Sequence, residues 1–283
     1  MLKHRIISFP LLLALLWAIF FAPNETLRNA LFAVCAPLAV GLALYEAGKL
    51  LLNIKLPCYP VFCGILGGAY ALFFCLMRMF FFDVSLTFAA SGVALLAVPW
   101  IVILFKNEKM FRRMVGSFGV LLALGLPLVL VLNLYYYNFS NVNLLIYVIL
   151  VTKATDTGGY IFGMLSGKLL PGGNHKIAPA LSPKKSWEGL IGGIALSVGV
   201  SLIFFRFAGA DAELAKYIIL AVILGICSFF GDITESGLKR VCGVKDSGNW
   251  IPGMGGAFDV LDSFIYVGIV VTLINIFFGL FTA

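Results

Sequence analysis

Charged side chains are scarce in this chain. Lys, Arg, Asp and Glu make up 12% of its 283 residues, and only 13 residues are acidic. Hydrophobic residues account for 61%, including 26 phenylalanines. So little polar surface cannot cover a soluble globule of this length, which excludes a soluble protein and indicates a polytopic membrane protein.

Sequence patterns for disulfides and for thiolate or imidazole metal sites are also absent. None of the cysteines has Cys-x-x-Cys spacing, and most lie in or beside apolar runs: Cys35, Cys58, Cys63, Cys75, Cys227 and Cys242. We therefore expect them to be small core residues. His4 and His175 are isolated in the sequence, with no partner at ligand spacing.

Long apolar runs, in contrast, are abundant. Runs near 20 residues predict an all-α transmembrane bundle of about nine spans. They lie at about 6–22, 30–47, 59–77, 84–105, 115–133, 143–165, 189–208, 216–232 and 258–280. We interpret the first run as a retained helix, because no small-x-small cleavage site follows it. We expect one membrane domain over residues 1–283, with mainly apolar scaffold helices in 1–142 and the polar, catalytic signals in 143–283.

The net charge of +7 is distributed unevenly over this predicted topology. With the N-terminus in the cytoplasm, about fifteen Lys and Arg residues lie on the cytoplasmic side and only Arg28, Arg78, Arg206 and Lys216 on the other. This is the positive-inside asymmetry, and it predicts a cytoplasmic N-terminus. It also accounts for the basic charge without a nucleic-acid partner.

Acidic residues concentrate in the segment 231–262, which holds five of the 13. The segment predicts a helix, a loop and a second helix. Four polar residues share one face of the first helix by their spacing: Asp232, Glu235, Ser236 and Lys239. Asp259 and Asp262, three residues apart, are expected on one side of the second helix.

The loop between these helices has the features of a polyphosphate site. Glycines recur at positions 243, 248, 253, 255 and 256, so the backbone can approach a ligand and turn its amides toward it. Lys239, Arg240 and Lys245 add positive charge. Carboxylates at two helix ends are ligands that Mg²⁺ prefers, with phosphate oxygens completing the shell. The alternative is a solvated loop whose charges only cap two helices.

Two spans carry ionisable groups of their own. Lys153 and Asp156 lie three residues apart within a span, where each would be costly alone, so we expect a pair on one face that borders a cavity. The alternative is a buried ion pair that only holds helices together. Glu46 lies near the inner end of the second span, where a snorkelling interfacial carboxylate is at least as good an interpretation as a catalytic one.

The segment 166–189 predicts a cytoplasmic loop with four lysines. Ser182 is predicted to be a helix N-cap, with Pro183 at the first helical position. Lys184 and Lys185 would then lie in the first turn and, with the free amides, form a phosphate site. The alternative is that these lysines only follow the positive-inside rule.

Together these residues resemble the phosphatidate cytidylyltransferases, also called CDP-diacylglycerol synthases. The family signature contains Ser-x-x-Lys-Arg, Lys-Asp, Pro-x-His-Gly-Gly and Asp-Arg-x-Asp. The similar residues here are Ser236, Lys239, Arg240, Lys245, Asp246, Pro252, Gly255, Gly256, Asp259 and Asp262. Asp156 with its glycines and the segment 182–189 also resemble the family. Met254 stands where the family usually has histidine, and Val260 where it usually has arginine.

The resemblance implies transfer of a cytidylyl group from CTP to phosphatidate, giving CDP-diacylglycerol and pyrophosphate. It implies an enzyme of phospholipid synthesis in a bacterial inner (plasma) membrane, and the positive-inside asymmetry predicts that its active site faces the cytoplasm. As a hypothesis, Asp232 and Asp259 hold a Mg²⁺ ion that also binds the CTP phosphates.

The other matched residues have expected roles in the same site. Lys239, Arg240 and Lys245 would stabilise the triphosphate, and Lys184 and Lys185 would bind a lipid or nucleotide phosphate. Asp156 and Asp262 would bind a second cation or orient the lysines. Asp246 is expected in catalysis. The residues expected in substrate binding also include Ser182, Ser236, Gly255 and Gly256.

Two other functions stay open. One is a related CTP-dependent enzyme that acts on another lipid phosphate or on a polyprenol. The other is an ion-coupled transporter whose pathway contains Lys153, Asp156 and Asp232, although no pair of broken helices in matching halves is visible. A homodimer is compatible with the sequence.

Overall fold

The computed structural model describes residues 10, 14–81, 107–179, 181–208, 212–250 and 255–281. In these ranges seven helices are long and apolar enough to cross a membrane, which confirms a bundle of membrane-length helices. They correspond to seven of the predicted spans. The predicted span at 84–105 and residues 6–9 and 11–13 of the one at 6–22 lie outside the described residues. The count of nine and the cytoplasmic N-terminus stay predictions.

The chain divides into two compact units. Unit 1 comprises Met1–Leu132 and Val241–Leu261, and unit 2 comprises Asn133–Arg240 and Asp262–Ala283. The prediction of one membrane domain stays a prediction.

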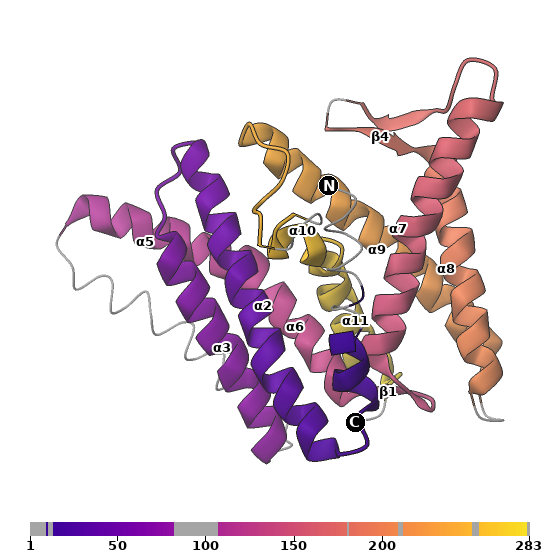
Figure 1. Ribbon diagram of the computed structural model, residues 1–283, viewed down its shortest axis with the longest axis horizontal. Helices are drawn as coiled ribbons and strands as arrows, with labels where there is room; N and C mark the ends of the chain where they lie inside the picture. Colours follow the sequence, from indigo (N-terminus) through magenta and orange to yellow (C-terminus); the bar gives the residue numbers. More distant parts are fainter. Residues whose placement is uncertain are drawn as a thin grey trace. The chain divides into compact units, whose positions relative to one another are not determined.

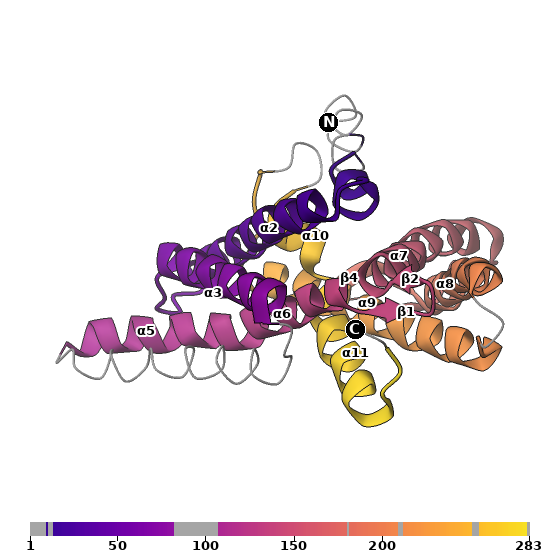
Figure 2. The same cartoon turned by 90° about the horizontal axis from the view of Figure 1, so that it is seen from below.

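Unit 1 is built from helices of both ends of the sequence. They are α2 (Glu25–Asn53), α3 (Pro60–Phe81), α5 (Glu108–Val120), the π-helical turn η1 (Leu121–Gly125), most of α6 (Leu126–Asn133) and α10 (Ala257–Leu261). α2 and α3 pack side by side (Figures 1 and 2). A Cβ added to Gly41 in α2 would lie 2.9 Å from the carbonyl oxygen of Gly64 in α3. Small residues thus allow the two helix backbones to approach closely.

Unit 2 contains the remaining helices and two short hairpins. Its elements are η2 (Leu134–Tyr136), β1 (Asn138–Phe139), β2 (Val142–Asn143), α7 (Leu144–Leu169), β3 (Lys176–Ala178), β4 (Ser182–Ser186), α8 (Trp187–Phe207), most of α9 (Leu214–Val241) and α11 (Phe264–Phe278). α7 and α8 lie side by side, and the β3–β4 hairpin connects their ends (Figure 1). Figure 2 shows the same pair from below.

The β3–β4 hairpin corrects the predicted start of α8. The segment expected to begin this helix is extended and pairs antiparallel with β3. The N-cap is Ser186, whose hydroxyl accepts a hydrogen bond from the Gly189 amide at 3.1 Å, and not Ser182. The prediction that Lys184 and Lys185 lie in the first helical turn is therefore wrong.

His175 explains why the helix begins only after the hairpin. The Trp187 amide donates to the His175 carbonyl oxygen at 3.0 Å, and the His175 amide donates to the Glu188 carboxylate. The His175 ring also lies 2.6 Å from Glu188 Oε1. His175, which is isolated in the sequence, thus holds the base of the hairpin against the first turn of α8 by hydrogen bonds.

The last membrane-length helix is interrupted at Asp262 and Ser263, between α10 and α11. Asp262 Oδ1 accepts a hydrogen bond from the Ser263 amide at 2.6 Å, a local contact that competes with the helical hydrogen-bond pattern. The prediction that Asp259 and Asp262 share one side of a continuous helix is therefore wrong.

The cysteine prediction is confirmed. All six thiols are free, and five of them are buried. Burial raises the pKa of Cys58, which follows α2 in the sequence, so its thiol is poorly reactive at neutral pH.

Candidate active site

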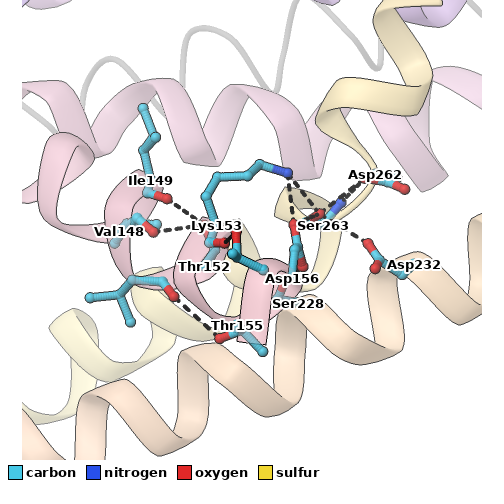
Figure 3. Close-up of polar contacts among 12 residues, drawn as sticks. Val148, Ile149, Thr152, Lys153, Thr155, Asp156, Ser228, Asp232, Asp262 and Ser263 are labelled. Carbon is cyan, nitrogen blue, oxygen red and sulfur yellow. Dashed lines mark hydrogen bonds and ion pairs between the residues drawn. The ribbon is translucent and has the colours of Figure 1, made fainter. Parts of the chain in front are cut away.

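A polar cluster in unit 2 is centred on Ser263, which is completely buried (Figure 3). Its hydroxyl lies 3.0 Å from Asp232 Oδ1, 3.0 Å from Asp262 Oδ1 and 3.3 Å from Asp156 Oδ2. Three carboxylates thus converge on one hydroxyl. They come from α7, α9 and the break between α10 and α11.

Two lysines complete this group, which we call the Ser263 cluster. Lys153 donates from Nζ to Asp156 Oδ2 at 2.9 Å and to Ser263 Oγ at 3.2 Å. Lys185 forms an ion pair with Asp232. Two ammonium groups therefore face three carboxylates, and the fully ionised cluster carries one net negative charge. Such an excess suits a bound cation.

The predicted pair of Lys153 and Asp156 is present, and it is not an isolated ion pair. Asp156 also accepts a hydrogen bond from Ser228 of α9 at 2.9 Å. The Lys153 ammonium lies 5.3 Å from the centre of the Phe264 ring. The pair thus joins α7 to α9 and to the start of α11.

The two hairpin lysines take different positions because side chains alternate along a strand. Lys185 contacts Asp232 and lies over the Phe229 ring, 4.6 Å from its centre. Lys184 is exposed. Of these two predicted phosphate ligands, only Lys185 belongs to the Ser263 cluster.

A second group of predicted residues surrounds Asp259 in unit 1. The Ser247 amide lies 3.1 and 3.0 Å from the two Asp259 carboxylate oxygens, and the Gly256 amide donates to Asp259 Oδ2 at 2.8 Å. Gly255 has a φ of +96°, and a Cβ there would lie 2.3 Å from Asp259 Oδ2. Glycine is thus needed at this position for both its conformation and its size. These amides of the glycine-rich loop face a carboxylate of the chain itself.

The other predicted residues differ in their exposure, and some fall outside the described residues. Lys239 forms an ion pair with Glu235, which is 3% exposed. The exposed ones are Lys184, Arg240, Lys245 and Asp246, and the partly buried ones are Ser182 and Ser236. Pro252 and Met254 lie outside the described residues.

The structure does not test the predicted metal site. Among the described residues, no three or more His, Cys, Asp or Glu side chains are grouped so that they could hold a metal ion. Mg²⁺, however, is usually held by only one or two carboxylates together with substrate phosphates. Asp232 belongs to unit 2 and Asp259 to unit 1, so their joint role as ligands stays a prediction.

Sequence reasoning missed Ser228, Ser263 and the position of Glu46. Ser263 directly follows Asp262 inside a membrane-length apolar segment, and that polar pair was an available signal. Glu46 is only 1% exposed, and its Oε2 accepts hydrogen bonds from Ser247 Oγ at 3.0 Å and from the Phe258 amide at 2.9 Å. The interpretation of Glu46 as a snorkelling carboxylate is therefore wrong.

Comparison with known proteins identifies related sequences. The sequence model described as Cytidylyltransferase family matches residues 3–278. A phosphatidate cytidylyltransferase of Staphylococcus haemolyticus is 40% identical over 136 residues, which are 47% of this chain and 50% of that protein. One of Haemophilus influenzae is 41% identical over 142 residues, 48% of this chain and 47% of that protein. The chain spans about half the length of these curated relatives.

Proposed function

We propose, since the chain belongs to the cytidylyltransferase family, that it transfers a cytidylyl group from CTP to phosphatidate and releases pyrophosphate. The names of the curated relatives support phosphatidate as the acceptor. The observation that carries the proposal is the convergence of three carboxylates and Lys153 on Ser263, with Lys185 paired to one of those carboxylates, in a chain of membrane-length helices. Such a site suits a charged phosphate reaction at a membrane.

The reaction requires little covalent chemistry from the protein. An oxygen of the lipid phosphate attacks the α-phosphorus of CTP, and the bond from that phosphorus to the oxygen bridging to the β-phosphate breaks. Pyrophosphate leaves, and the lipid and cytidylyl phosphates are joined in CDP-diacylglycerol. A phosphate monoester is already largely ionised near neutral pH, so no strong general base is needed. The protein contributes orientation and charge neutralisation.

The Ser263 cluster supports specific roles for its lysines. Lys185 is paired with Asp232 and would bind a phosphate oxygen next to that carboxylate. Asp156 holds the Lys153 ammonium at 2.9 Å and would orient it in the site. Lys239, Arg240 and Lys245 would add positive charge for the triphosphate and for departing pyrophosphate.

We assign Mg²⁺ to Asp232 and Asp259, with phosphate oxygens of CTP as further ligands. The hard carboxylate oxygens of Asp232 and Asp259 suit this ion. When bound, Mg²⁺ would neutralise charge on the triphosphate. Asp262 would hold a second cation or keep the lysines oriented.

The distribution of Lys and Arg supports a site on the cytoplasmic side. The bacterial origin of the relatives supports a location in the inner (plasma) membrane of a bacterium.

Pyrophosphate release by detergent-purified protein tests the proposal. Release should require CTP, Mg²⁺ and phosphatidate together, and a CDP-lipid should form in equal amount. Asp232→Asn should abolish release while the protein stays folded. Release with another lipid phosphate or a polyprenyl phosphate, and not with phosphatidate, would change the acceptor. Absence of release from folded protein with every acceptor would refute a cytidylyltransferase.

A further inference from the structure

Glu46 is a buried carboxyl group in α2, within the half of the chain that the sequence presents as scaffold. Its side chain is 1% exposed in a membrane-length helix. Burying such a group is costly unless hydrogen bonds compensate it. Its hydrogen bonds with described residues both end on Oε2, from Ser247 Oγ and from the Phe258 amide. Within the described part of the chain, Oε1 has no hydrogen-bond partner.

The partners of Glu46 are also the neighbours of Asp259. Ser247 donates its hydroxyl to Glu46 and its amide to the Asp259 carboxylate. Gly256 donates its amide to Asp259, and a Cβ on Gly256 would lie 2.2 Å from Glu46 Oε2. Phe258 directly precedes Asp259. Glu46 thus contacts the chain both before residue 251 and after residue 254.

We propose that Glu46 is a positioning residue that fixes the orientation of the Asp259 carboxylate for Mg²⁺. The inference rests on the proposed function, in which Asp259 is a metal ligand. The bonds from Glu46 hold two backbone segments, and those segments hold Asp259 by three amide contacts. A ligand held in one orientation loses less conformational freedom when it binds a metal. Replacing a residue that orients a metal ligand typically lowers metal affinity or activity by about 10–100-fold.

Substitutions of Glu46 can test whether its hydrogen bonds are needed. Because both hydrogen bonds end on one oxygen, Glu46→Gln keeps both through its amide carbonyl and places its NH₂ group where Oε1 lies. Glu46→Ala loses both bonds. Glu46→Met also loses both bonds but keeps a side chain of similar length, so a role in filling space alone predicts that it behaves like Glu46→Gln, whereas the proposed role predicts that it behaves like Glu46→Ala.

The test uses full-length protein in detergent and two measurements. The first is Mn²⁺ binding without nucleotide, followed by electron paramagnetic resonance. The second is the Mg²⁺ concentration for half-maximal, lipid-dependent pyrophosphate release. Glu46→Ala should raise both constants by about 10–100-fold, while Glu46→Gln should stay within about 3-fold of the unsubstituted protein. Glu25→Ala changes an exposed carboxylate of the same helix and should alter neither constant.

Two further variants provide a reference for the loss of metal binding and a test that remains if Glu46→Ala does not fold. Asp259→Asn should weaken Mn²⁺ binding at least as much as Glu46→Ala, and Ser247→Ala, which loses one of the two bonds, should give a smaller shift in the same direction. Unchanged Mn²⁺ binding in Glu46→Ala, or equal losses in Glu46→Ala and Glu46→Gln, would overturn the inference. If Glu46→Ala does not fold, unchanged Mn²⁺ binding in Ser247→Ala overturns it.

The same experiment separates failure of the inference from failure of the proposed function. If Asp259→Asn loses Mn²⁺ binding and Glu46→Ala does not, only the role of Glu46 is wrong. If Asp259→Asn binds Mn²⁺ normally, the metal assignment is wrong. If the unsubstituted protein releases no pyrophosphate with CTP and any lipid acceptor, the proposed reaction is wrong.

Discussion

Replacing Ser263 with alanine removes the hydroxyl that contacts Lys153 and all three carboxylates of the cluster. This hydroxyl has one hydrogen, so it donates to only one of Asp156, Asp232 and Asp262 at a time, while it accepts a hydrogen bond from Lys153. Ser263→Ala therefore removes two charge-assisted hydrogen bonds and leaves three carboxylates without their shared donor.

The expected loss of stability follows from the number of hydrogen bonds removed and from their exposure to water. A hydrogen bond to a charged group contributes about 1.5–3 kcal/mol. The lower value applies to the bond that Ser263 donates, because one hydrogen is shared among three carboxylates. It also applies to the bond from Lys153, because the Lys153 side chain is 41% exposed. We expect Ser263→Ala to lower the free energy of unfolding by about 3 kcal/mol. For a chain of this size, the midpoint of thermal unfolding would fall by roughly 6–12 °C.

Ser197→Ala is the matched control for this measurement. Ser197 is also completely buried in unit 2, but it donates to the neutral carbonyl oxygen of Ile194 at 2.8 Å. Its loss should cost only about 1 kcal/mol. Thermal unfolding in detergent, followed by tryptophan fluorescence, compares the two variants. A loss in Ser263→Ala no larger than in Ser197→Ala would refute the reasoning. Adding Asp262→Asn to Ser263→Ala should recover part of the midpoint, because it removes one of the three negative charges.

Three other substitutions test the packing and the site. Gly158→Ala should destabilise the protein by about 1–3 kcal/mol, because its Cβ would lie 2.9 Å from the α8 backbone, whereas Gly199→Ala has open space and should be neutral or stabilising in the same unfolding assay. Gly255→Ala should raise the Mg²⁺ requirement of pyrophosphate release, because the new methyl group displaces the nearby carboxylate; an unchanged Mg²⁺ titration would contradict this. Lys153→Met should lower the unfolding midpoint, and adding Asp156→Asn should restore part of it, because the first change leaves a carboxylate uncompensated. A double variant less stable than Lys153→Met would count against that pairing.

Hydropathy and local spacing were sufficient for much of this molecule. The seven described membrane-length helices follow from apolar runs, because each run has to span a fixed thickness of hydrocarbon. The pair of Lys153 and Asp156 follows from a three-residue spacing on a helix. Both predictions use distances within one element. No tertiary contact is needed to make them.

Predictions failed where another part of the chain decides the local conformation. Ser182 followed by Pro183 is a good helix start, but β3 supplies backbone partners that keep this segment extended. His175 then fixes the true start of α8 through Glu188, thirteen residues away in sequence. The break at Asp262 has a different origin, since a carboxylate hydrogen-bonds to the next residue and competes with the helix.

Glu46 shows the limit of sequence reasoning most clearly, because its chemistry depends on contacts that no spacing encodes. It lies about two hundred residues from Ser247 and Phe258, and only the packing of α10 against α2 brings them together. From sequence alone, a carboxylate near a helix end fits both an interfacial position and a buried one. Burial to 1% decides between them, because a side chain that reaches water does not need two internal donors. A carboxyl group in an apolar helix can therefore be recognised as costly from the sequence, but its partners, and hence its role, come only from the fold.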